Sequence, residues 1–164
     1  MQLHNLRTGI GYDTHAFGSD KPLILGGITI PAPQGLLAHS DGDVLVHALI
    51  DALLGAASMP DIGALFPDTD QQYKNISSML LLQKVKNQIS DQWEIINADM
   101  IIICERPKMR HHIPSMKKNI IEVLGTDAVN VKATTTEGMN AEGEGRCISA
   151  QAAVLILRRD SSVR

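Results

Sequence analysis

Three residues in the first third of the chain have the types and spacing of a metal site. Asp13 and His15 are separated only by Thr14, and His47 follows 32 positions after His15. Alternate residues of a β-strand project to the same face, so Asp13 and His15 can hold one ion together. One carboxylate and two imidazoles suit Zn²⁺, with a fourth tetrahedral position left open for substrate or water. The pattern therefore predicts a catalytic zinc site.

The segment around His47 supplies the acidic neighbours that such a site uses. Asp43, His47 and Asp51 recur at four-residue steps and so form one polar stripe on a predicted helix. A metal-bound histidine usually donates its second ring N–H to a carboxylate, and we expect Asp43 or Asp51 to accept it. The alternative is an ordinary solvent-exposed helix face, since a single Asp-x-His pair is common by chance.

The elements that would position these ligands follow from the hydrophobic pattern. It predicts strands over 7–17, 23–30, 93–105, 130–136 and 147–157, and helices over 43–57, 77–89 and 114–125. We expect Asp41 to cap the first helix, Gly26-Gly27 to mark a bend or bulge, and 59–73 to be a long loop. The last strand is apolar on both faces. Either a second subunit covers the face that the helices leave open, or one chain holds a two-sided core.

A second group of polar residues lies where the strand over 130–136 ends. Thr134, Thr135 and Thr136 are followed directly by Glu137. Hydroxyls at a strand end suit phosphate oxygens, and a carboxylate suits Mg²⁺ or Mn²⁺. Threonine is equally common in strands for packing alone, so the residues themselves leave both interpretations open.

Composition and the missing motifs exclude several classes of protein. The 164 residues are enough for one domain with a substantial core. A net charge of −3 and 3% aromatic residues argue against a nucleic-acid partner. The sequence has no secretory leader and no apolar run of about twenty residues, so we expect a cytoplasmic protein with no membrane partner. Cys104 and Cys147 are expected to be small apolar strand residues.

Several motifs taken together resemble the 2-C-methyl-D-erythritol 2,4-cyclodiphosphate synthase family. They occur in order, as GIGYDTH at 9–15, LLAHSDGD at 36–43 with His47, DIG at 61–63, LFPDTD at 65–70, PKM at 107–109 and KATTTE at 132–137. The resemblance implies an α+β fold, with a mixed β-sheet, helices packed on one face, and subunits that assemble as a homotrimer through the other. It implies a single domain over 1–164, with 1–6 as an extension and 159–164 as a tail.

The activity that this resemblance implies is a metal-dependent cyclisation. The family converts 4-diphosphocytidyl-2-C-methyl-D-erythritol 2-phosphate to the 2,4-cyclodiphosphate and releases CMP, in non-mevalonate isoprenoid biosynthesis. One phosphate attacks another within the same molecule, so no protein nucleophile is needed and positioning dominates catalysis. Two other classes remain open: a zinc phosphohydrolase that acts on an external phosphate, and a non-catalytic relative that binds a nucleotide or isoprenoid phosphate.

The resemblance also implies roles by position. Asp13, His15 and His47 match the zinc ligands, Glu137 matches a contact to a second ion (Mg²⁺ or Mn²⁺), and His39 and Thr135 match the residues that stabilise the transition state. Substrate contacts are implied for Asp13, His15, His39, Ser40, Asp61, Ile62, Gly63, Phe66, Pro67, Asp68, Thr69 and Asp70, and, around the cytidine diphosphate, for Cys104, Pro107, Lys108, Met109, Arg110, Thr134, Thr135, Thr136 and Glu137.

One segment departs from the family pattern. Between Glu137 and Gly143 the chain looks short and lacks a phenylalanine and an arginine that face the substrate in many members. Glu142 would repel a polyphosphate if it pointed inward. We therefore expect the loop to turn Glu142 outward, or another cation, from Lys132, Lys108 or Arg146, to compensate.

Overall fold

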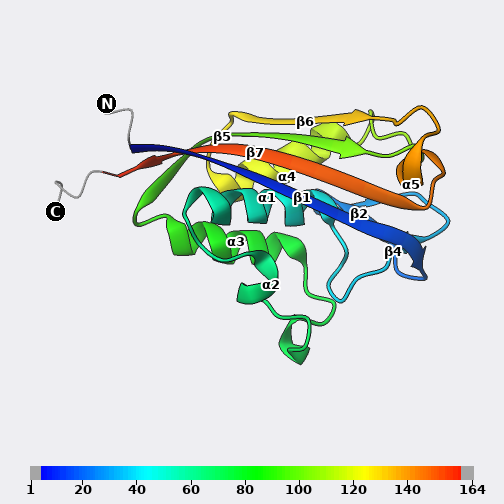
Figure 1. The fold of residues 1–164 in the computed structure, drawn as a ribbon, viewed down its shortest axis with the longest axis horizontal. Helices are drawn as coiled ribbons and strands as arrows, with labels where there is room; N and C mark the ends of the chain where they lie inside the picture. Colours follow the sequence, from blue (N-terminus) through cyan, green and yellow to red (C-terminus); the bar gives the residue numbers. More distant parts are fainter. Residues whose placement is uncertain (1–4, 160–164) are drawn as a thin grey trace.

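A five-stranded sheet organises the computed structural model, which describes residues 5–159 (Figure 1). The strand order is β4-β1-β7-β5-β6, and the strands are β1 (Leu6–Ser19), β4 (Gly35–Leu36), β5 (Trp93–Ile103), β6 (Val129–Thr134) and β7 (Cys147–Arg158). β5 and β6 run parallel, whereas the other neighbours run antiparallel. The sheet is therefore mixed, which confirms the predicted α+β class.

Helices cover one face of this sheet. α1 (Val44–Ala56) lies across β1 and β7, α3 (Ser78–Ile89) packs on α1, and α4 (Ile113–Leu124) packs on β6 and α3. Because α1 is enclosed between the sheet and α3, it is buried nearly all round. The alternative of an ordinary solvent-exposed helix face is therefore wrong, and His47 is only 8% exposed.

The remaining elements correct three local predictions. The segment over 23–30 is not one bent strand, because Gly26 and Gly27 take positive φ angles of 59° and 71° and form the turn of a hairpin between β2 (Leu23–Leu25) and β3 (Ile28–Ile30). The predicted loop over 59–73 contains α2 (Ile62–Leu65) and the 3₁₀ turn η2 (Gln71–Tyr73). α1 is capped by Asp43 rather than Asp41, since the Asp43 side chain accepts from the backbone N–H of Val46.

Two glycines let β1 approach α1 unusually closely. A Cβ atom on Gly11 would lie 1.9 Å from the carbonyl oxygen of Ala48, and one on Gly9 would meet the next turn of the helix at the same distance. By strand alternation, both glycines share a face of β1 with Asp13. Their lack of side chains therefore allows α1 to bring His47 down onto that strand.

The opposite face of the sheet is left open by the described chain. On β7, buried residues facing α1 alternate with exposed ones such as Gln151 and Ala153. On β1, Ile10 is 83% exposed and Tyr12 is 52% exposed. Within one chain, then, the last strand is buried all along one face, whereas the other face is buried at Ser149 and exposed at Gln151 and Ala153.

The N-terminal extension predicted over 1–6 and the tail predicted over 159–164 lie partly outside the described residues, at 1–4 and 160–164. β1 begins at Leu6, which pairs with Leu157 on β7, and Arg159 donates its backbone N–H to the carbonyl of Gln92. Over residues 5–159, no helix has the length and apolar character needed to cross a membrane.

Candidate functional site

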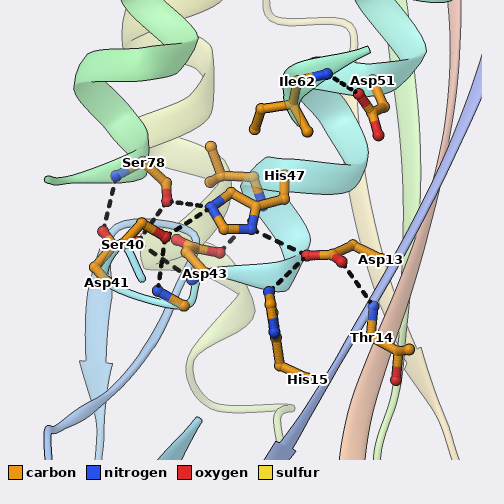
Figure 2. A network of polar contacts seen from close by, with 12 residues as sticks. Asp13, Thr14, His15, Ser40, Asp41, Asp43, His47, Asp51, Ile62 and Ser78 are labelled. Atoms are coloured by element: carbon orange, nitrogen blue, oxygen red, sulfur yellow. Dashed lines mark hydrogen bonds and ion pairs between the residues drawn. The ribbon is translucent and has the colours of Figure 1, made fainter. Parts of the chain in front are cut away.

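Asp13, His15 and His47 converge where β1 passes the first turn of α1 (Figure 2). Asp13 Oδ2 lies 3.2 Å from His15 Nε2 and 3.0 Å from His47 Nδ1. Ligand atoms bound to a tetrahedral zinc at about 2.0–2.1 Å lie about 3.3 Å from one another. The two distances to Asp13 are therefore close to the spacing that such an ion requires, and all three ligand atoms lie within 4.8 Å of one another. Within the described residues these side chains form the one candidate metal-binding group of three.

The two histidines favour an ionised Asp13. Burial raises the pKa of this carboxyl, but hydrogen bonds from His15 and His47 outweigh burial and hold its pKa well below the usual range. Burial lowers the pKa of His47, whereas the hydrogen bond to Asp13 and the charges of nearby aspartates raise it, and the net direction is upward. A metal ion entering here would displace the proton on His47 Nδ1.

The second ring nitrogen of His47 contacts hydroxyl groups rather than the predicted carboxylates. Nε2 lies 2.8 Å from Ser78 Oγ and 3.2 Å from Ser40 Oγ. Neither Asp43 nor Asp51 reaches this nitrogen, because both are engaged with backbone N–H groups. Ser78 was missed in the sequence because it opens a different helix, α3, and no spacing rule connects it to His47.

Asp43 and Asp51 fix the backbone around the site instead. Asp43 caps α1 and accepts from the backbone N–H of Gly27 at 2.8 Å with its other oxygen. This carboxyl is fully buried, which raises its pKa to about 6. Asp51 accepts from the backbone N–H of Ile62 at 2.8 Å, so it ties the start of α2 to α1.

A cleft of about 390 Å³ opens beside the three ligands. It is lined by the ligands, by the predicted contacts His39, Ser40, Ile62, Gly63, Phe66, Pro67 and Asp68, and by Ala38, Tyr73, Ile76 and Leu81. The predicted contacts Asp61, Thr69 and Asp70 are not in this lining. Asp61 and Asp70 instead cap α2 and η2, respectively.

His39 lines this cleft and has an unpaired ring nitrogen. Its Nε2 is buried and has no hydrogen-bond partner in the described protein. The backbone carbonyl of His39 accepts from the N–H of Asn75 at 2.9 Å, which holds the loop in place. A buried polar atom without a partner costs about 1–3 kcal/mol, so this nitrogen is suited to bond a ligand.

The second predicted cluster lies apart from the cleft, at the ends of the parallel strands β5 and β6. The backbone N–H of Cys104 donates to the carbonyl of Thr134 at 3.0 Å and so joins the segments 104–110 and 134–137. Thr135 Oγ1 donates to Glu137 Oε1 at 2.7 Å. No residue of either segment is among those that line the cleft. One chain thus places the predicted substrate contacts in two groups.

Two of the predicted contacts in the second cluster have side chains that face the core. Cys104 is 5% exposed and Met109 is 3% exposed. Burial raises the pKa of the Cys104 thiol to about 11, and its S–H donates to the carbonyl of Arg106 at 2.9 Å. A ligand at this cluster would therefore have to meet the backbone of these two residues.

Comparison with known proteins decides the family. The model of the YgbB family matches residues 6–157. The chain belongs to the YgbB family. A 2-C-methyl-D-erythritol 2,4-cyclodiphosphate synthase from Clostridium botulinum (strain Kyoto / Type A2) is 54% identical over 154 residues, which cover 92% of this chain and 99% of the relative. The resemblance seen in the motifs is therefore confirmed.

Solved structures of the family share the fold. The bifunctional IspDF from Campylobacter jejuni matches with a TM-score of 0.90 and 42% identity over 94% of this chain, which spans 43% of that longer protein. IspF from Plasmodium falciparum, solved as a CDP complex, matches with a TM-score of 0.83 and 32% identity over 97% of this chain and 100% of that one.

The segment after Glu137 is folded in this YgbB-family chain as the single helical turn α5 (Asn140–Gly143). Glu142 bends back to the sheet and accepts from Ser149 Oγ at 2.6 Å. Of the cations expected to compensate, Lys132 and Arg146 each pair with a neighbouring carboxylate at 2.5 Å, whereas Lys108 forms no ion pair with the described residues. Of the three cations, Lys108 is therefore the one whose charge is not already paired within the described residues.

Proposed function

We propose that this chain is a 2-C-methyl-D-erythritol 2,4-cyclodiphosphate synthase, a phosphorus–oxygen lyase that cyclises 4-diphosphocytidyl-2-C-methyl-D-erythritol 2-phosphate and releases CMP. The observation that carries the proposal is the ligand triad beside a cleft, in a chain that is 54% identical to a synthase of this name over nearly its whole length. The family structure solved as a CDP complex supports a cytidine diphosphate group as part of the ligand.

The metal held by Asp13, His15 and His47 is proposed to be zinc. One carboxylate and two imidazoles, with their ligand atoms within 4.8 Å of one another, suit Zn²⁺ better than Mg²⁺, which prefers oxygen ligands. When bound, the ion supplies charge neutralisation at a phosphate oxygen. Glu137 is proposed to bind Mg²⁺ or Mn²⁺, with further ligands from the substrate's phosphates, since no second group of three protein ligands lies in the described residues.

The protein's own contribution is to bend the substrate and stabilise the charge that develops. The cleft residues from Ile62 to Asp68 would hold the erythritol phosphate portion, so that the 2-phosphate oxygen meets the β-phosphorus in line while the bond to CMP breaks. The free Nε2 of His39 is suited to hydrogen-bond a phosphate oxygen, and the Thr135 hydroxyl is proposed to do the same.

A single copy of the chain does not bring all these residues together, so we propose a homotrimer. The segments 104–110 and 134–137 would complete the cleft of an adjacent copy, and the open face of the sheet with Ile10 and Tyr12 would pack between subunits. Light scattering during size-exclusion chromatography is expected to give three times the chain mass. A monomer that is fully active would refute this arrangement.

Phosphorus NMR tests the reaction directly. Purified protein with Zn²⁺, Mg²⁺ and the diphosphocytidyl substrate is expected to yield CMP and the cyclic diphosphate. Inorganic phosphate in place of CMP would indicate a zinc phosphohydrolase instead. Tight binding of the substrate without turnover would indicate a non-catalytic relative.

A further inference from the structure

A hydrogen-bonded chain runs from the metal-site histidine through the buried Ser78 to the half-buried Asp41 (Figure 2). His47 Nε2 lies 2.8 Å from Ser78 Oγ, and that hydroxyl in turn bonds Asp41 Oδ1. Asp41 Oδ2 accepts from the backbone N–H of Ser78 at 2.8 Å, so the carboxylate bonds both the backbone and the side chain of this residue. Ser78 is fully buried and is not part of the cleft lining, so its hydroxyl has no role toward a ligand there.

The carboxylate of Asp41 fixes the direction of each hydrogen bond in this chain. An ionised Asp41 can only accept, so the Ser78 O–H points toward it. The lone pairs of Ser78 Oγ then face His47, and His47 Nε2 must carry the hydrogen. Nδ1, which lies 3.0 Å from the ionised Asp13 and donates to it, is consequently the nitrogen whose hydrogen an ion would replace.

We propose that Ser78, oriented by Asp41, is a positioning residue of the metal site: it selects the His47 tautomer that binds the ion through Nδ1 and holds the ring in that orientation. The inference rests on the zinc site proposed above. Partners of this kind raise metal affinity because the ligand does not have to be reoriented or change tautomer on binding.

Ser40 is a weaker partner for the same nitrogen. Its Oγ lies farther from His47 Nε2, at 3.2 Å, and also accepts from the backbone N–H of Gly42 at 3.3 Å. No carboxylate orients its hydroxyl, and Ser40 lines the cleft, where a ligand competes for it. Ser78 is therefore the partner that stays bonded to His47 when substrate is bound. Ser40 can still bond the same nitrogen, so it limits the loss of metal affinity when Ser78 is replaced.

Asp41 also joins two segments that meet at the site. Its backbone N–H donates to the carbonyl of Ile76 at 3.1 Å, just before α3 begins. The N-cap residue of α3, Ser77, makes no side-chain capping bond, so the carboxylate of Asp41 caps this helix from a distance. The loop that carries His39 and Ser40 is thereby fastened to α3 at the point where Ser78 meets His47.

Metal affinity of the full chain tests the proposal. We expect Ser78→Ala to weaken Zn²⁺ binding about tenfold or more, measured at fixed pH by competition with a chromophoric chelator. Ser77→Ala is the matched control, because this adjacent serine makes no side-chain capping bond, and it is expected to bind Zn²⁺ as the unchanged protein does. Unchanged affinity in Ser78→Ala would overturn the positioning role, whereas no Zn²⁺ binding by the unchanged protein would overturn the zinc site as well.

A spectroscopic readout separates positioning from a general loss of structure. In the zinc-loaded protein labelled with ¹⁵N-histidine, His47 is expected to show a slowly exchanging Nε2–H, which Ser78→Ala exposes to rapid exchange. If Ser78→Ala fails to fold, Asp41→Asn provides the second test, since it keeps an oxygen for the Ser78 backbone N–H but no longer dictates the direction of the hydroxyl. We expect a severalfold loss of affinity, and no loss in a folded Asp41→Asn protein would overturn the proposal.

Discussion

Replacing Gly11 by alanine should separate the two halves of the metal site. The new Cβ would lie 1.9 Å from the carbonyl oxygen of Ala48, and real Cβ atoms essentially never approach closer than 3.0 Å. The strand or the helix must therefore move by about 1.1 Å, since closely packed backbone has no void to absorb it. If α1 lifts as a unit, the distance from His47 Nδ1 to Asp13 Oδ2 grows from 3.0 Å toward about 4 Å, beyond the spacing of about 3.3 Å that a tetrahedral zinc needs.

The thermal stability of Gly11→Ala reports the overpacking, and its metal content reports the wider spacing of the ligands. Overpacking of this kind costs about 1–3 kcal/mol, which for a chain of this size lowers Tm by about 2–12 °C. We expect Gly11→Ala to show that loss in calorimetry, and to retain less zinc after dialysis against a weak chelator.

Gly55→Ala provides the matched control for this substitution. Gly55 lies on the same helix, and its Cβ would come no closer than 3.9 Å to any atom, the nearest being the carbonyl oxygen of Ile10. Gly55 is the penultimate residue of α1, so alanine there should stabilise the protein by less than the roughly 1 kcal/mol of a helix-interior site and leave zinc binding unchanged. A Gly11→Ala protein with the Tm and zinc content of Gly55→Ala would refute the idea that close backbone approach builds the site.

Three further substitutions test the side chains around the ion. His47→Ala should lose bound zinc and activity but keep its circular dichroism and cooperative unfolding; an unfolded variant would make the site structural. Asp51→Ala should raise KM severalfold with little change in kcat, because α2 loses the bond to the Ile62 N–H, whereas Asp51→Asn keeps an acceptor and should restore KM. Burial raises the pKa of Asp43 from its ordinary 3.8 to about 6, so the folded protein binds a proton between about pH 4 and 6 that the unfolded chain releases. The free energy of unfolding should therefore fall as pH rises through this window, by about 2–3 kcal/mol from this group, and urea titrations of Asp43→Asn should lack that component.

The sequence predicted those parts of the molecule that follow from local pattern. Two-residue spacing in a strand correctly indicated that Asp13 and His15 project together, and hydrophobic periodicity located α1, α3 and α4 to within about two residues. The assignment of His47 to the same site rested on the ligand chemistry of the three side chains, because no local pattern indicates that β1 and α1 lie together.

Contacts between distant segments were beyond local reasoning. The polar stripe of α1 left a solvent-exposed helix face open as an alternative, but α3 packs on α1 and the helix is buried nearly all round, which only the tertiary structure shows. Packing also explains why Asp43 and Asp51 are not partners of His47. Backbone N–H groups away from water need an acceptor, and the two carboxylates accept from Gly27 and Ile62 instead. Ser78 then meets the histidine from α3, and no spacing in the sequence could have indicated that contact.

A histidine on an otherwise apolar, buried helix is tolerated only if both of its nitrogens are paired. Nδ1 of His47 faces Asp13 and Nε2 faces Ser78, so the metal-free protein already satisfies the ring. The two contacts thus fix the orientation of the His47 ring beside Asp13. The glycine-lined contact between β1 and α1 keeps the two elements that carry these residues close together, so Asp13 and His47 meet without help from any other segment.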